Sequence, residues 1–114
     1  MIVLVLFAVG MTVNASNGDK EKPNAVATNY SEVLSEIIYP EICREQAIEG
    51  TVLVEILVDR KGRIRKHEIL ESPNDELSQA VVNAIPTLEF MPAIKNGKNV
   101  SSKVLIPVNF KLTY

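Results

Sequence analysis

The sequence predicts an α+β domain in which two main helices pack on one face of a three-stranded antiparallel sheet, in the order α-β-β-α-β. Two stretches, 51–58 and 103–112, place apolar residues at every second position, which is the period of a half-buried strand. A third stretch, 77–85, places them at the helical spacing i, i+3, i+4, i+7 and i+8. A chain of 114 residues with 46% hydrophobic side chains has room for one such core.

Two short helices are expected at the start of the domain, one on either side of Tyr39-Pro40. They are separated because the residue before a proline avoids the helical region. Ser31 can cap the first helix, and Gly50 ends the second. Cys43 is the only cysteine, so no intramolecular disulfide can form, and we interpret it as a small buried hydrophobic residue.

A β-hairpin follows, with strands over 51–58 and 63–71 joined by a tight turn at 59–62. In this turn Gly62 is expected to take the left-handed conformation that other residues avoid. The apolar residues of the second strand do not keep one period. We therefore expect a β-bulge near Lys66 or a weakly buried outer strand.

The longest helix is expected after Ser72 and Pro73, which are a capping residue and a proline suited to a first helical turn. Pro86 stops this helix. A loop with a turn at Asn96-Gly97 then leads to the last strand.

The last strand, 103–112, carries Pro107 at its centre. A proline offers no N–H to a sheet ladder and is confined to edge strands, strand starts and bulges. We therefore expect this strand to be an edge strand, and the purpose of such an edge needs an explanation.

The N-terminal segment is organised differently. The first fifteen residues contain no charge, and Val-Asn-Ala at 13–15 offers small residues at the spacing that a signal peptidase prefers. We interpret residues 1–15 as a secretory signal peptide or a short anchor. Residues 16–29 are polar and show no apolar period, so they are expected to form a flexible tether. The domain is expected over 30–114.

Motifs that carry chemistry are sparse. The net charge of -2 and the pI near 5.4 argue against nucleic acid as a partner. His67 is the only histidine and has no cysteine nearby, so we expect a surface or edge side chain, and no metal or other cofactor. The chain has no nucleophile elbow and no phosphate loop, and Ser72 and Asp75 are interpreted as helix-start residues. We predict a binding module without catalytic residues, not an enzyme.

Basic side chains cluster at the expected hairpin tip. Such a cluster can contact an anionic lipid or an acidic glycan, although a solvated tip is the simpler interpretation. The cluster comprises Arg60, Lys61, Arg63, Arg65, Lys66 and His67.

Four short motifs occur together over residues 30–112: a Tyr-Pro start, a Phe-x-Pro-Ala loop, an Asn-Gly-Lys turn and an Ile-Pro-Val-x-Phe end. With the residues between them they resemble the C-terminal domain of the TonB family. The matching residues are Tyr39-Pro40, Ala47, Glu49-Gly50, Val52, Asp59, Gly62, Ser72, Leu77, Ala80, Phe90, Pro92-Ala93, Asn96-Gly97-Lys98, Val100 and Ile106-Pro107-Val108-Asn109-Phe110.

The resemblance implies the same small sheet with two helices on one side, and it also implies a function. In TonB this domain lies in the periplasm, where its last strand pairs with the TonB box, a short extended segment of an outer-membrane transporter. The free side of the last strand is then the site of strand addition. The expected peptide-binding residues are Lys103, Val104, Leu105, Ile106, Pro107, Val108, Asn109 and Phe110, and the outward side chains expected to select the peptide are Lys103, Leu105, Asn109 and Lys111.

The chain departs from a full TonB, which has a long membrane anchor that engages the motor proteins ExbB and ExbD, and a long proline-rich spacer. Here residues 16–29 span ~50 Å at most, at ~3.5 Å per extended residue. We therefore favour an exported periplasmic module, and leave open whether ExbB and ExbD take part. Leu88 also stands where many relatives carry an aromatic residue. Two alternatives remain: a domain that forms a homodimer through its last strand, and a truncated energy transducer anchored in the inner membrane.

Overall fold

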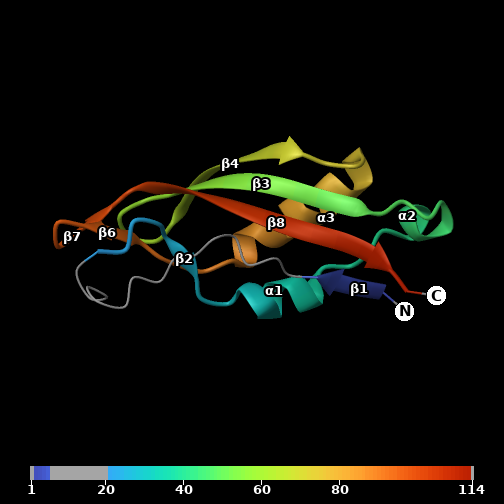
Figure 1. The fold of residues 1–114 in the computed structure, drawn as a ribbon, viewed down its shortest axis with the longest axis horizontal. Coiled ribbons are helices and arrows are strands. Elements are labelled where there is room, and N and C mark those ends of the chain that lie inside the picture. Colours follow the sequence, from blue (N-terminus) through green and yellow to red (C-terminus); the bar gives the residue numbers. More distant parts are fainter. Residues whose placement is uncertain (1, 6–20, 114) are drawn as a thin grey trace.

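The computed structural model describes residues 2–5 and 21–113, which form an α+β fold. Its elements are β1 (Ile2–Val5), β2 (Val26–Ala27), α1 (Tyr30–Glu36), α2 (Glu41–Glu45), β3 (Gly50–Val58), β4 (Ile64–Glu71), α3 (Asp75–Ala84), a 3-10 turn (Ile85–Thr87), β5 (Phe90–Met91), β6 (Ala93–Lys95), β7 (Lys98–Val100) and β8 (Ser102–Leu112). The main sheet has the strand order β1-β8-β3-β4, and α3 crosses behind it (Figure 1).

The three-stranded antiparallel sheet expected from the sequence is confirmed as β8-β3-β4. Its central strand, β3, pairs with β8 along its whole length, from Gly50 opposite Phe110 to Val58 opposite Ser102. Two minor pairs, β2 with β5 and β6 with β7, lie outside this sheet. The central position of β3 leaves β8 and β4 as the outer strands of the predicted sheet.

The hydrophobic core lies between one face of the sheet and the helices. Tyr39 and Phe110 meet at its centre as an edge-to-face pair, with ring centroids 5.3 Å apart and an interplanar angle of 89°. The Tyr39 hydroxyl donates a hydrogen bond to the carbonyl oxygen of Ile48. The buried residues of the two long strands are Val52, Val54, Ile56 and Val58 in β3, and Ile106, Val108, Phe110 and Leu112 in β8.

The β3–β4 hairpin agrees with the sequence prediction. Gly62 lies at φ +81°, in the left-handed region. Leu57 pairs with Lys66 while Val58 pairs with Ile64, so Arg65 is an extra residue in β4. The expected bulge is therefore present next to Lys66, and β4 is also an outer strand with mostly exposed side chains.

Both helix starts differ from the prediction. α1 follows Asn29, so Ser31 lies inside the first turn and does not cap it. α3 follows Asn74, whose Oδ1 accepts a hydrogen bond from the Leu77 amide at 3.0 Å. Ser72 lies two residues earlier and its hydroxyl donates to the Asn74 carbonyl oxygen instead. The residue that immediately precedes the helix is therefore Asn29 for α1 and Asn74 for α3, and not the predicted serine.

The second helix is shorter than expected. α2 ends at Glu45, well before Gly50. Ala47 has φ +53°, a left-handed conformation that a helix cannot contain, and this residue turns the chain toward β3. Cys43 is fully buried, which confirms its interpretation as a small core residue.

The expected flexible tether over 16–29 is wrong for its second half, because these residues pack on the domain. Ala25 is buried, and β2 pairs antiparallel with β5. Lys22 exchanges two backbone hydrogen bonds with Ile94, of 2.9 and 2.8 Å. These partners are far apart in the sequence, so a local apolar period does not reveal them. The packed part of the domain therefore extends N-terminally beyond residue 30, at least to Lys22.

Residues 2–5, which belong to the expected signal peptide or anchor, form β1 beside β8. The other residues of segment 1–15 lie outside the part of the chain that the structure describes. Within the described ranges, none of the helices combines the length and the apolar character needed to cross a bilayer.

Candidate functional site

The outer edge of β8, meaning the side of this strand that faces away from β3, is the candidate site. Pro107 lies opposite Leu53 in the β3–β8 register. Since a proline has no N–H to donate to β3, its backbone nitrogen and carbonyl must point toward the outer edge. Backbone groups alternate in direction along a strand, so Lys103, Leu105 and Asn109 also point their N–H and C=O groups outward.

Two hydrogen bonds support this alternation. The Tyr30 hydroxyl, from α1 beside β8, donates to the Pro107 carbonyl oxygen at 2.7 Å. The Leu112 amide points to the other side of β8, toward β3, and donates to Glu49 Oε2 at 2.9 Å, next to the first residue of β3. Pro107 is therefore tolerated because its missing donor falls on the open side of the strand.

The eight predicted peptide-binding residues divide into two sets. Ile106, Val108 and Phe110 turn their side chains into the core and their N–H and C=O groups toward β3, so they offer no backbone hydrogen bonds to an added strand. Val104 is half-buried in the same phase. The residues that present backbone groups at the outer edge are Lys103, Leu105, Pro107 and Asn109, and Lys111 follows in the same phase.

The outward side chains expected to select a peptide lie on the sheet face opposite the core. Lys103 and Lys111 are exposed, and Leu105 retains 41% of its accessible surface. Lys103 Nζ lies 3.9 Å from Glu55 Oε1, and Asn109 Oδ1 accepts a 3.0 Å hydrogen bond from the Thr51 hydroxyl. The face beside the edge therefore offers two cations and one exposed apolar side chain.

Tyr30 is the functional residue that the sequence did not indicate. Its hydroxyl already donates a hydrogen bond to the Pro107 carbonyl oxygen, and Pro107 has no N–H. The row of backbone groups available for pairing along the outer edge of β8 is therefore interrupted at Pro107. Burial of the hydroxyl raises the pKa of Tyr30 to about 12 from its ordinary value of 10.0. A tyrosine in the first turn of a helix carries no pattern that points to a strand 77 residues away.

The Tyr30 hydrogen bond predicts a specific alkaline response. The folded chain keeps this proton up to about pH 12, whereas the unfolded chain loses it from pH 10.0, so the free energy of unfolding falls as pH rises across this window. Tyr30→Phe should lose about 1 kcal/mol at pH 8 and show a shallower decline between these pH values. Urea unfolding of both proteins measures this difference, and equal slopes would contradict it.

The structure already places one strand on the outer edge. β1 runs antiparallel to the C-terminal end of β8, with Val5 opposite Asn109 and Val3 opposite Lys111. Because Asn109 and Lys111 point their backbone outward, these two positions are the hydrogen-bonded pairs of the ladder. The next outward position of β8 is Pro107, which has no N–H to donate to a strand on this side.

The opposite edge of the sheet is protected. β4 carries two register irregularities and a row of exposed charged side chains, which are the features that discourage strand addition. His67 belongs to this row and is exposed, which confirms its expected surface position. Asp59 orders the basic tip, since its carboxylate accepts the amides of Arg63 and Lys61, which lower its pKa. Among the described residues, no group of three potential metal ligands occurs.

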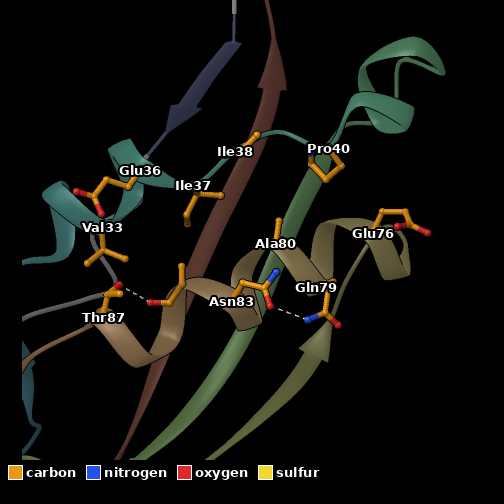
Figure 2. Close-up of a pocket in the computed structure, with 11 residues that line it drawn as sticks. Val33, Glu36, Ile37, Ile38, Pro40, Glu76, Gln79, Ala80, Asn83 and Thr87 are labelled. Atoms are coloured by element: carbon orange, nitrogen blue, oxygen red, sulfur yellow. Dashed lines mark hydrogen bonds between the residues drawn. The ribbon is translucent and has the colours of Figure 1, made fainter.

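A groove of about 420 Å³ lies between α1 and α3 (Figure 2). Ile38, 81% exposed, stands at its margin. Two hydrogen bonds join groups of its lining, from Gln79 to Asn83 Oδ1 at 2.8 Å and from the Thr87 hydroxyl to the Ala84 carbonyl oxygen at 2.6 Å, and the carboxylates of Glu36 and Glu76 also line it. The groove therefore combines apolar side chains with two acidic ones. Its lining consists of Val33, Glu36, Ile37, Ile38, Pro40, Glu76, Gln79, Ala80, Asn83, Ala84 and Thr87.

Comparisons with known proteins show which family and which relatives this chain resembles. The family described as Gram-negative bacterial TonB protein C-terminal matches residues 35–112. The chain is similar to the protein TonB of Vibrio cholerae, with 41% identity over 75 residues, and to the protein tonB2 of Pseudomonas aeruginosa, with 33% identity over 75 residues. Each match covers 65% of this chain but only 31% and 28% of the relatives, so the chain spans about a third of their length.

The fold is also similar to a solved structure, the solution NMR structure of the Pseudomonas aeruginosa TonB C-terminal domain. The TM-score is 0.59 at 25% sequence identity, and the match covers 80% of this chain and 89% of the other. The region that matches the family contains β3, β4 and β8, and therefore includes the strand whose outer edge is the candidate site.

Proposed function

The chain belongs to the TonB C-terminal family, and on this premise we propose that it is a periplasmic binding module that captures an extended peptide by strand addition to the outer edge of β8. The partner is a segment like the TonB box of an outer-membrane transporter, so the module serves TonB-dependent transport. Main-chain hydrogen bonds supply the affinity, and side chains beside the edge supply the selection.

One observation carries this proposal: the outer edge of β8 accepts a strand. β1 pairs there with four residues, from Asn109 to Leu112. In the described ranges no strand pairs with residues 102–108 on this side, so the edge has further capacity beyond β1. The bulged and charged β4 offers no comparable surface.

The geometry of the edge restricts the peptide. Pro107 gives no donor and its carbonyl is held by Tyr30, so an added strand pairs on either side of this residue and is interrupted at it. Lys103 and Lys111 flank the edge with positive charge, which favours a peptide with acidic side chains at the matching positions. The affinity is expected to be modest, because few backbone bonds form and the peptide must be ordered.

The test is an NMR titration of the isotope-labelled full chain with TonB box-like peptides of outer-membrane transporters. We expect chemical-shift changes concentrated on residues 102–112, with the outward amides of Lys103, Leu105 and Asn109 most affected. Binding that perturbs only the basic tip at residues 60–67 would contradict strand addition and favour an anionic surface as partner. A dimer by size measurement that excludes the peptide would favour self-association.

A pair of variants separates backbone pairing from side-chain contact. Leu105→Pro removes one outward N–H in the same phase as Pro107, where a proline is tolerated, and should weaken peptide binding about fivefold to tenfold. Leu105→Ala keeps this N–H and should weaken binding less. Equal losses in the two variants would mean that the side chain, and not the backbone, makes the contact.

A further inference from the structure

The strand that covers part of the candidate site comes from this chain itself. β1 pairs with four consecutive residues at the C-terminal end of β8. In the described sheet it is the outermost strand on that side. Residues 2–5 contain no charge, and Ile, Val and Leu suit an extended strand.

β1 uses the same atoms that an incoming peptide needs. Beyond Pro107, the outward N–H and C=O groups of β8 belong to Asn109 and Lys111, and both residues lie opposite β1 residues in hydrogen-bonded pairs. A second strand cannot reach these groups while β1 is in place. The two occupants of this half of the edge therefore exclude each other.

We propose that residues 2–5 act as a built-in competitor that closes the C-terminal half of the outer edge of β8 until they are displaced or removed. This inference rests on the proposed function, since competition requires that the edge binds a peptide. A chain that keeps these residues presents only the half at residues 102–106. A chain cleaved after Ala15, where the sequence predicts a signal peptidase site, presents both halves.

The competitor is weak enough to be displaced. Residues 2–5 contribute two hydrogen-bonded pairs, Val5 with Asn109 and Val3 with Lys111, and at the next outward position Pro107 has no N–H and its carbonyl oxygen already accepts from Tyr30. The covalent link of the competitor to the domain gives it a high effective concentration, so it covers the edge despite this short ladder. The apparent affinity for a peptide falls by the fraction of chains in which the edge is covered.

Proline substitution in β1 tests the inference in the full chain. Val3 and Val5 direct their N–H groups at β8, so the double variant Val3→Pro/Val5→Pro removes both donors. In the matched control, Ile2→Pro/Leu4→Pro, the same number of prolines replaces N–H groups that point away from β8. We expect the first variant to bind TonB box-like peptides about tenfold more tightly than the parent and the control.

Amide hydrogen exchange without peptide provides an independent measurement. Asn109 and Lys111 amides should exchange faster in Val3→Pro/Val5→Pro than in the parent or in the control. Equal peptide affinities in all three proteins would overturn the competition and leave the proposed function intact. Absence of peptide binding in every protein would overturn the proposed function and the competitor role together.

Discussion

Phe110→Ala should lower the free energy of unfolding by about 3–5 kcal/mol, the range for removal of a buried aromatic side chain. Phe110 is fully buried and stands edge-on to the ring of Tyr39, so the variant loses apolar burial and the aromatic contact together. A domain with a total stability of about 5–15 kcal/mol keeps little reserve after such a loss. Thermal unfolding should show a fall in melting temperature of at least roughly 12 °C.

The control for this variant lies on the same strand. Leu105 keeps 41% of its surface accessible on the opposite face, so Leu105→Ala should cost less than about 1 kcal/mol. If Phe110→Ala melted at the parent temperature, the side-chain alternation of β8 would be opposite to the one described. The outward direction inferred for the N–H and C=O groups of Leu105 would then be wrong as well.

Gly62→Ala should lose roughly 2–5 kcal/mol, because left-handed strain and overpacking add at this site. Gly62 lies at φ +81° in the β3–β4 turn, and a Cβ there would stand 2.3 Å from the carbonyl oxygen of Phe90. That oxygen belongs to the backbone and cannot move without shifting β5. Urea unfolding measures the loss, and β5 amide shifts in NMR spectra should report the displaced strand.

Gly97→Ala separates the two causes. Gly97 has nearly the same conformation, φ +76°, but no atom lies within 4 Å of the point where a Cβ would stand. It should therefore lose only the conformational cost, about 1–2 kcal/mol. Similar losses in the two variants would mean that the turn does not press against Phe90.

The long strands and their faces could be predicted from the sequence, because their period is local. Every second residue of β3 is buried from Val52 onward, and the same holds for β8 from Ile106 onward. The turn at Gly62 could be predicted for the same reason, because the four residues 59–62 are a local sequence typical of a tight turn that ends in a left-handed glycine. Pro107 predicted an edge strand, and among the described residues this holds for 102–108, whereas residues 109–112 pair with β1 on the same side, so β8 lies inside the four-stranded sheet.

The features that the sequence did not reveal depend on distant partners. Tyr30 reaches the Pro107 carbonyl across 77 residues, and the buried Ala25 amide donates to the Ser102 hydroxyl at the same separation. Ala25 belongs to no periodic segment, and the helical spacing that Tyr30 shares with Val33 and Leu34 does not point to β8. The pairing of β1 with β8 likewise joins residues 2–5 to residues 109–112, and a local sequence pattern cannot reveal a pairing over that separation.

The helix starts differ from the prediction because two suitable capping residues stand close together in each case. The Asn29 side chain donates to the Thr87 carbonyl oxygen at 2.8 Å and accepts from the Glu89 amide at 2.9 Å, and these bonds to the 3-10 turn and the residues after it fix the position of the chain where α1 begins. Asn74 caps α3 directly while Ser72 supports it from outside. The sequence alone does not decide between two neighbouring capping residues, because the choice depends on how the loop before the helix packs against the rest of the domain.

The interruption at Pro107 also bears on how copies of this chain behave at high concentration. A strand of 11 residues with strong β-propensity is a template for edge-to-edge stacking wherever its edge is open, and such stacking requires unbroken backbone pairing over about six residues. Pro107 and the Tyr30 hydroxyl divide the outer edge of β8 into two pieces that are each shorter than such a segment. Fibril growth along this edge therefore lacks a continuous ladder of backbone hydrogen bonds.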